Sequence, residues 1–130
     1  LFIVEDDKFY AQIVQSFFIA QGFKECLIFE SGKACLENLH LNPKIIFLDY
    51  FLGLENGNEV LKQIKSIRPQ SYVVMLSGQE HVHVSIKSLK HGAFDYIEKN
   101  SNSLENCLKV AESILEIEDE KQNLNTYTKK

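Results

Sequence analysis

The stretch IIFLDYFLGLENG, residues 45–57, holds the pattern that decides the fold. Its opening run is apolar without alternation, which is typical of a short strand buried on both faces of a parallel sheet. Asp49 follows where this strand would end, and ligand sites in open α/β sheets lie beyond the carboxyl ends of the strands. Gly53 and the pair Asn56-Gly57 then favour a turn, because these residues tolerate positive φ. We therefore expect Asp49 to face a crevice and a mobile turn to follow it.

On both sides of this stretch, apolar runs alternate with helical patterns. Strands are expected at 1–4, 23–29, 45–48, 72–76 and 93–98. The helices between and after them carry apolar residues at three-to-four spacing. Their expected apolar positions are Phe9, Ile13, Phe17 and Ala20; Ala34, Cys35, Leu36 and Leu39; Val60, Leu61, Ile64 and Ile67; Val82, Ile86 and Leu89; and Leu104, Leu108, Ala111, Ile114 and Leu115. This alternation predicts an α/β fold, a doubly wound five-stranded parallel sheet of order 2-1-3-4-5.

Composition argues against several classes of protein. With 130 residues and a net charge of −4, the chain suits one soluble domain and not a surface for a nucleic-acid backbone. Cys26, Cys35 and Cys107 are odd in number and lack CxxC spacing, which favours buried reduced thiols over a disulfide framework, a zinc site or redox sensing. No apolar run approaches the roughly 20 residues of a membrane span. We expect a cytoplasmic domain without direct contact to nucleic acid or membrane.

Polar side chains follow four of the expected strands at their carboxyl ends. They are Glu5, Asp6 and Asp7 after the first strand, Asp49 after the third, Ser77 after the fourth and Lys99 after the fifth. Capping of the next helix accounts for Asp7, but not for three adjacent acids. The first and third strands are neighbours in the expected order, so their carboxylates would converge and call for a hard cation such as Mg²⁺. Ser77 and Lys99 suit phosphoryl oxygens, which makes Asp49 a candidate nucleophile.

The order and separation of these motifs resemble the receiver domain of two-component response regulators. The motifs are VEDD at 4–7, LD at 48–49, Asn56-Gly57, Ser77-Gly78, Gly92-Ala93 with Asp95-Tyr96, and Lys99. The resemblance covers residues 1–116 and implies a flavodoxin-like three-layer sandwich, with 117–130 as an extension of the last helix and a linker or tail. It implies a signalling domain and not an enzyme. Such a domain accepts phosphate from a sensor histidine kinase or phosphotransfer protein and acts on an output domain or partner that the sequence does not identify.

The resemblance also implies roles for individual residues. Asp49 would be the phosphoacceptor, Ser77 and Lys99 would contact the phosphoryl group, and Tyr96 would be the aromatic switch that follows Ser77. The implied Mg²⁺ ligands are Glu5, Asp6, Asp49 and the backbone carbonyl of Phe51, and Mn²⁺ could substitute. Switching would change the surface of the fourth helix, fifth strand and fifth helix. A homodimer there could set Lys87 and Lys90 against Asp95 or Glu98 of a second copy.

Two positions depart from the family's pattern. Gly53 stands where a proline is usual, and Asn100 replaces the proline after the lysine. Both changes are expected to loosen the backbone, and a cis peptide between Lys99 and Asn100 would be costly. Phe51 and Gln79 lie where the family tunes the lifetime of the phosphate. A bulky Phe51 is expected to hinder the hydrolytic water and lengthen that lifetime.

Three alternatives are weighed against a phosphorylated receiver. A degenerate receiver would bind partners without phosphorylation. A phosphatase with an Asp nucleophile needs a second acid where Phe51 stands. A flavin-binding module needs a glycine- and hydroxyl-rich loop where the chain has Glu5, Asp6 and Asp7. His81 and His83 suggest a metal only weakly, since no third ligand accompanies them, and we expect both to be exposed.

Overall fold

The structure is a computed structural model that describes residues 1–78 and 82–128, without the side chains of 82–85 and 125–128. Five parallel strands form one sheet in the order β2-β1-β3-β6-β7. The strands are β1 (Phe2–Val4), β2 (Leu27–Phe29), β3 (Ile45–Asp49), β6 (Tyr72–Ser77) and β7 (Asp95–Glu98). Counted within this sheet, the order is the predicted 2-1-3-4-5, so the predicted fold class is confirmed.

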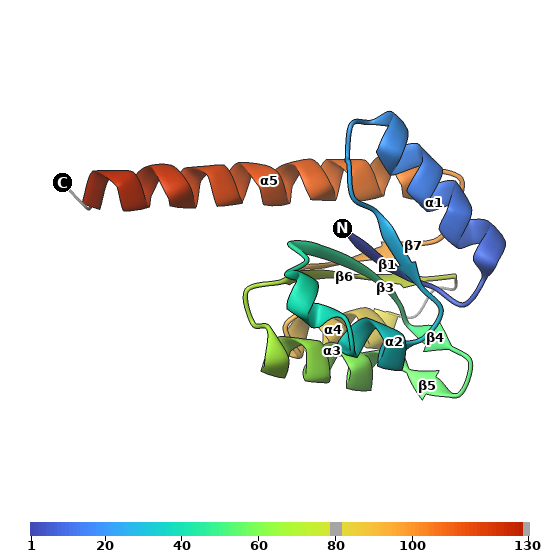
Figure 1. Ribbon diagram of the computed structural model, residues 1–130. Coiled ribbons are helices and arrows are strands. Elements are labelled where there is room, and N and C mark those ends of the chain that lie inside the picture. The colour runs from blue at the N-terminus through green and yellow to red at the C-terminus, as the bar shows by residue number, and fades with distance from the viewer. Residues whose placement is uncertain (79–81, 129–130) are drawn as a thin grey trace.

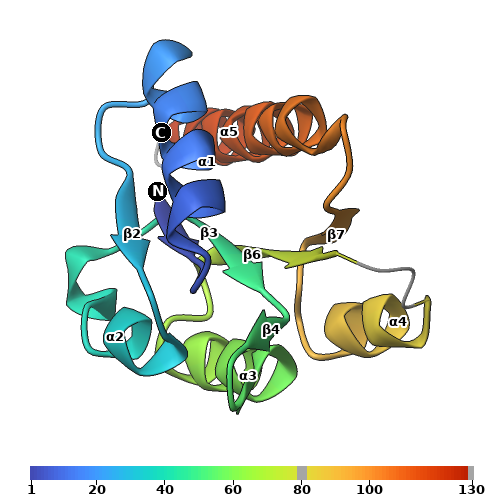
Figure 2. The same ribbon diagram turned by 90° about the vertical axis from the view of Figure 1, so that its right-hand side faces the viewer.

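Helices cover both faces of the sheet and give the molecule three layers (Figures 1 and 2). They are α1 (Lys8–Ala20), α2 (Gly32–Leu36), α3 (Gly57–Ile67), α4 (Val82–Lys90) and α5 (Ser103–Thr128), with a short 3-10 helix at Leu39–Leu41. Helices α1 and α5 lie on one face, and α2, α3 and α4 lie on the other. We call these the α1/α5 layer and the α3/α4 layer. In the part of the chain that the structure describes, no helix is both long and apolar enough to cross a membrane.

Strand β3 is buried on both faces, as its unalternating sequence predicts. Phe47 belongs to the hydrophobic cluster under the α1/α5 layer, and its ring centroid lies 5.3 Å from that of Phe18 on α1. Ile46 and Leu48 belong to the opposite cluster, together with Leu61 of α3. Successive side chains of a strand point to opposite faces, so only a strand between two helical layers can be apolar at every position.

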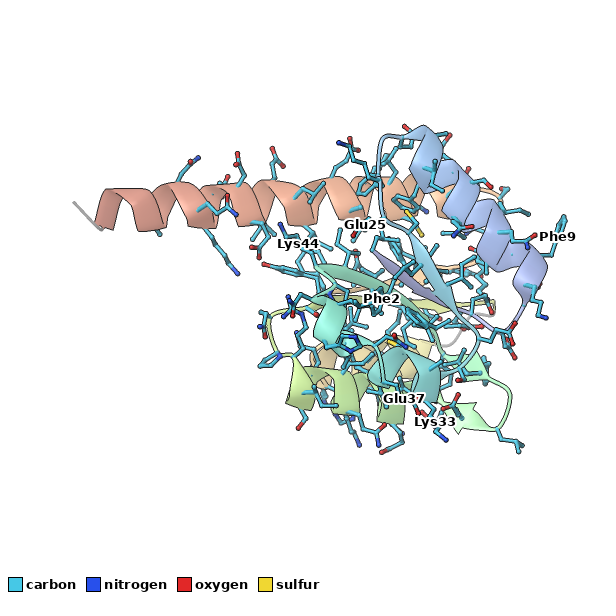
Figure 3. All side chains as sticks on the ribbon, in the orientation of Figure 1. Phe2, Phe9, Glu25, Lys33, Glu37 and Lys44 are labelled. Carbon is cyan, nitrogen blue, oxygen red and sulfur yellow. The ribbon has the colours of Figure 1, made fainter. Side chains whose placement is uncertain are left out.

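The apolar face predicted for α1 is wrong. Phe9 and Ile13 are 74% and 39% exposed, whereas Ala11, Val14 and Phe18 are fully buried. Figure 3 shows the Phe9 side chain pointing away from the body of the molecule. Both stripes have helical spacing, and periodicity alone does not choose between two adjacent apolar stripes of one helix. On α3, α4 and α5 the predictions for Ile67, Ile86, Leu89 and Leu115 are wrong, because these side chains are exposed. Most other predicted positions of α3 and α5 are buried as expected, among them Val60, Leu61, Ile64, Ala111 and Ile114.

One predicted boundary also differs from the structure. Strand β2 begins at Leu27 instead of residue 23, because Phe23 closes the end of α1: its N–H donates to Phe18 O at 3.0 Å, and the two rings meet edge to face. Helix α5 runs on through the residues after 116 that were expected to extend the last helix, as far as Thr128, and projects from the body (Figure 1). The apolar stripe does fade there. Continuous helical hydrogen bonding does not require an apolar stripe.

Several local predictions are confirmed. The Asp7 carboxylate caps α1 by accepting from the N–H groups of Phe9 and Tyr10, and Ser31 Oγ accepts from Ala34 N at 3.1 Å at the start of α2. All three cysteines are buried and unpaired. Burial raises the pKa of the Cys35 and Cys107 thiols to about 12, so they stay protonated and pack as apolar groups.

Candidate functional site

Three carboxylates meet at the carboxyl edge of the sheet. Val4 pairs with Leu48 in the β1–β3 register, so Glu5 and Asp49 leave adjacent strands side by side. Glu5 is 1% exposed and Asp49 is 4% exposed, while Asp6 is open to solvent. One carboxylate oxygen from each of the three acids lies within 4.8 Å of the others. The structure thus brings together the acids that the sequence nominated as metal ligands.

Lys99, at the end of β7, reaches across the site to the two buried acids. Its Nζ forms an ion pair with Glu5 Oε1 and lies 3.1 Å from Asp49 Oδ2. Burial and the neighbouring Asp49 raise the pKa of Glu5 from its ordinary 4.5 to about 8, against the opposing pull of Lys99. Burial lowers the pKa of Lys99, but the hydrogen bond to Glu5 and the charges of both acids outweigh it and raise that pKa overall. The site therefore favours the ammonium form of Lys99. The positive charge of this lysine does not balance the negative charge of the carboxylates around it.

Ser77 ends β6 next to the phosphoacceptor candidate. Asp49 pairs with Leu76, and Ser77 pairs with Glu98 of β7, so the hydroxyl stands between the strands that carry Asp49 and Lys99. Ser77 is fully buried, and its Oγ finds no hydrogen-bond partner among the residues that the structure describes. An unpaired buried hydroxyl is uncommon and costly, which indicates that a further group completes it.

The turn after Asp49 is a hairpin. Strands β4 (Phe51–Leu52) and β5 (Glu55–Asn56) pair in antiparallel fashion, with Leu52 opposite Glu55. Gly53 has φ of +62°, and positive φ at the first position of a two-residue loop is typical of a type II′ turn. Proline cannot adopt this φ. Gly53 therefore fits a particular turn that proline could not form, and the loosening of the backbone stays a prediction.

The hairpin is also held from the side. The Glu55 carboxylate accepts from the N–H groups of Gly32 and Lys33, at 2.9 and 3.2 Å, at the start of α2. Phe51 N–H donates to Asp49 Oδ1 at 3.3 Å, and the Phe51 ring packs against Tyr50 although its side chain is 51% exposed. These contacts tie the residues after Asp49 to α2 and to Asp49 itself.

Gly57, the first residue of α3, has a role that its turn-forming tendency did not reveal. Its N–H donates to Tyr50 O at 2.8 Å. A Cβ at Gly57 would lie 2.6 Å from Tyr50 Cα and 2.9 Å from Asp49 O. Only glycine lets the start of α3 approach the end of β3 this closely.

Tyr96 and Asn100 are two further predicted residues within the described part of the chain. Tyr96 is half-buried against the hydrophobic cluster of the α3/α4 layer. Among the described residues no peptide bond is cis, so Lys99 and Asn100 are joined by a trans bond. Asn100 Oδ1 accepts from Asn102 N at 2.9 Å just before α5. Gln79 and His81 fall in the range 79–81, and the side chain of His83 likewise lies outside the described residues.

Sequence reasoning missed two residues beside the site. The ring centroid of Tyr10, on α1, lies 4.7 Å from Lys99 Nζ. The Tyr10 hydroxyl is 3.1 Å from Oγ of Ser103, the first residue of α5. A tyrosine in the first turn of a helix carries no signal of such a contact, because the contact joins segments that are distant in sequence.

A parallel sheet that gathers three acids, a lysine and an unpaired hydroxyl at its carboxyl edge defines a receiver-type signalling domain. Residues 1–111 match the family described as the response regulator receiver domain. The chain belongs to this family, and so to the signalling domains of two-component systems. Receiver domains generally bind Mg²⁺ through acidic residues, and the cluster of Glu5, Asp6 and Asp49 supplies oxygen ligands of the kind that Mg²⁺ prefers.

Relatives support this assignment. The chain is 30% identical over 105 residues to the nitrogen assimilation regulatory protein NtrX of Azorhizobium caulinodans, covering 79% of this chain and 23% of that protein. It is 27% identical over 124 residues to the DNA-binding transcriptional regulator NtrC of Klebsiella pneumoniae, covering 95% of this chain and 26% of that protein. The crystal structure of the receiver domain of NtrX from Brucella abortus matches with a TM-score of 0.81 and 27% identity, covering 88% of this chain and 97% of that one. The chain thus spans about a quarter of the two curated relatives.

Proposed function

We propose that this domain accepts a phosphoryl group on Asp49 from a sensor histidine kinase or phosphotransfer protein, and that the modified domain binds a partner differently. The observation that carries the proposal is the buried Ser77 Oγ, which lacks a hydrogen-bond partner among the described residues. A phosphoryl oxygen on Asp49 would supply the missing acceptor. Burying the unpaired hydroxyl costs free energy, and a hydrogen bond to the phosphoryl oxygen would remove that cost. The domain would therefore favour the phosphorylated state.

The residues around Asp49 would have separate roles in the phosphoryl transfer. Asp49 would form an oxygen–phosphorus bond while the bond between phosphorus and the donor breaks. Lys99 Nζ, 3.1 Å from Asp49 Oδ2, would pair with the charge on the phosphoryl oxygens. Phe51 N–H, which donates to Asp49 Oδ1, would hold the carboxylate in one orientation. These contacts present the nucleophile and leave the hydroxyl of Ser77 as an additional donor.

Mg²⁺ fits the donor set. Glu5, Asp6, Asp49 and the backbone carbonyl of Phe51 would hold it, and Mn²⁺ could replace it. The ion would offset the repulsion among the carboxylates and between them and an incoming phosphate. The raised pKa of Glu5 supports this, because burial and the neighbouring Asp49 disfavour its charged form and a bound cation would offset both.

The readout would be the surface of α4, β7 and α5. Ser77 and Tyr96 would link it to Asp49, as in the family. Lys87 and Lys90 are exposed on α4 and could face Asp95 or Glu98 of a second copy in a homodimer. Residues 1–116 would form the receiver domain, with 117–130 as an extension of the last helix and a linker or tail.

Intact mass spectrometry tests the proposal. The protein is incubated with a small phosphodonor in the presence of Mg²⁺ or of a chelator, and Asp49→Asn serves as the control. We expect one phosphoryl adduct that requires Mg²⁺ and is absent from the Asp49→Asn protein. No adduct on a folded protein that binds Mg²⁺ would contradict the proposal and favour a receiver that binds partners without phosphorylation.

Phe51 offers a second test at the same site. Its exposed ring lies two residues from Asp49, where it would hinder approach of the hydrolytic water. Phe51→Asn should therefore lose phosphate faster than the wild type when the decay of the adduct is followed by mass. A markedly slower decay in the variant would refute this role.

A further inference from the structure

We propose that Tyr10 is a positioning residue for Lys99, and that its ring is in turn fixed by Ser103 at the start of α5. The inference rests on the proposed function, because the lysine matters for phosphorylation of Asp49. Tyr10 and Ser103 lie outside the motifs that the sequence shows at the strand ends.

The contact between Tyr10 and Lys99 has the geometry of a cation–π interaction. Lys99 Nζ lies 4.7 Å from the ring centroid, within the roughly 6 Å over which the negative face of an aromatic ring attracts a cation. The ammonium also contacts Glu5 and Asp49, and the lysine side chain is only 19% exposed. Tyr10 thus contacts the ammonium in addition to its two carboxylate partners.

Tyr10 is itself held at both ends. Its backbone N–H donates to the capping carboxylate of Asp7 at 3.2 Å. Its hydroxyl lies 3.1 Å from Ser103 Oγ, and Ser103 is 3% exposed. Burial raises the pKa of the Tyr10 hydroxyl, so it stays protonated and able to donate. A ring anchored in this way defines a fixed face on which the flexible lysine stem can rest.

This anchoring matters because Lys99 would have to serve two arrangements. Before phosphorylation it pairs with Asp49 Oδ2, and afterwards it would pair with a phosphoryl oxygen beyond that atom. A lysine with four rotatable bonds reaches many other positions, and each one that the ring excludes lowers the entropic cost of the productive contact. Leucine at position 10 would fill much of the space without attracting the ammonium.

The rate at which Asp49 is phosphorylated by a small phosphodonor with Mg²⁺ tests the inference. We expect Tyr10→Leu to lower that rate about threefold, as the loss of one partly buried cation–π contact implies. Tyr10→Phe and Ser103→Ala both keep the ring but remove the hydrogen bond that anchors it, so each should lower the rate by up to about twofold, less than Tyr10→Leu does. Equal rates for Tyr10→Leu and the wild type would overturn the inference. A loss as large in Tyr10→Phe as in Tyr10→Leu would also overturn it, because the ring would not be the active feature.

A second measurement separates positioning from general support of the fold. In a Lys99→Ala background, Tyr10→Leu should not change the residual rate, because its effect passes through the lysine. The ring current of Tyr10 should also move the NMR signals of the Lys99 ε-methylene upfield, and Tyr10→Leu should abolish this shift while Tyr10→Phe keeps it. An unchanged shift in Tyr10→Leu would refute the contact. Failure of wild-type protein to form the Asp49 adduct would instead contradict the proposed function.

Discussion

The two helical layers reach the acid site by different kinds of contact. On the side of the α1/α5 layer the contact is electrostatic, since the ring of Tyr10 on α1 faces the ammonium of Lys99, which also pairs with Glu5 and Asp49 at the strand ends. On the side of the α3/α4 layer it is steric and neutral, since Gly57 presses its backbone against Tyr50. The first layer is therefore suited to sense a change of charge at Asp49, and the second a change of shape.

The neutral contact extends to α4 through a buried hydrogen bond. Asn58 follows Gly57 in the first turn of α3, and its Oδ1 accepts from Ser88 Oγ of α4 at 2.8 Å. Both side chains are buried. A buried polar pair fixes the relative position of two helices more narrowly than apolar packing does, because misalignment leaves polar atoms unpaired. The backbone beside Asp49 is thereby connected to α4 without any ionised group.

Of the changes that test the difference between the two layers, Gly57→Ala should have the largest effect on stability. The new Cβ would overlap the Tyr50 backbone, which cannot move without displacing the end of β3. We expect the free energy of unfolding to fall by about 3 kcal/mol in chemical denaturation. Gly78→Ala is the matched control, because no described atom lies within 4 Å of a Cβ there. Similar stability of the two variants would show that the steric contact does not hold the α3/α4 layer.

Removing one partner of the buried pair comes next. Ser88→Ala leaves Asn58 Oδ1 buried without its donor and should cost about 2 kcal/mol of stability. The double variant Asn58→Leu, Ser88→Ala removes both polar groups and should regain most of that loss. Thermal and denaturant unfolding of both proteins would show it. Equal losses in the single and double variants would mean that the hydrogen bond is not the cause.

Changing the protonation of Glu5 tests the charged contacts of the site without affecting the steric contact of Gly57. Its pKa of about 8 lies above the ordinary 4.5, so the metal-free folded protein holds a proton that the unfolded chain releases between these values. Stability should therefore fall as pH rises from about 4.5 through 8. Mg²⁺ would displace that proton, and its apparent affinity, measured by titration calorimetry, should rise up to about tenfold per pH unit below pH 8. Glu5→Gln should flatten both pH profiles. A pH-independent affinity in wild type would argue that Glu5 is already ionised.

The smallest effect is expected where α5 leaves the body. The Tyr72 hydroxyl donates to Glu118 Oε1 at 2.6 Å and accepts from Lys121 Nζ at 2.9 Å. Tyr72→Phe keeps the ring that meets Phe94 and removes both hydrogen bonds. Amide exchange at 117–124 should accelerate by less than about fivefold, with 103–114 as the internal control. A larger change spreading into 103–114 would show that the extension supports the whole α1/α5 layer.

Much of the site could be predicted because the topology of the sheet determines where the residues at the strand ends lie. Asp49, Ser77 and Lys99 each stand at the end of a strand that the sequence predicts, and parallel strands bring their carboxyl ends to one edge of the sheet. Strand order then brings Glu5 beside Asp49. The Asp7 and Ser31 caps could also be predicted from the sequence, since a cap depends on residues only a few positions apart.

The structure alone decided which helical stripe is buried and which side chains meet across layers. Periodicity marks both apolar stripes of α1, and only contact with the sheet selects Ala11 and Val14 over Phe9. The contacts of Tyr10 with Ser103 and of Asn58 with Ser88 join distant segments, so no local pattern announces them. By itself the sequence determined the alternation of strands and helices and the chemical groups at the strand ends, because these depend on near neighbours. The tertiary structure decided how the groups are held, because that depends on the relative position of whole elements.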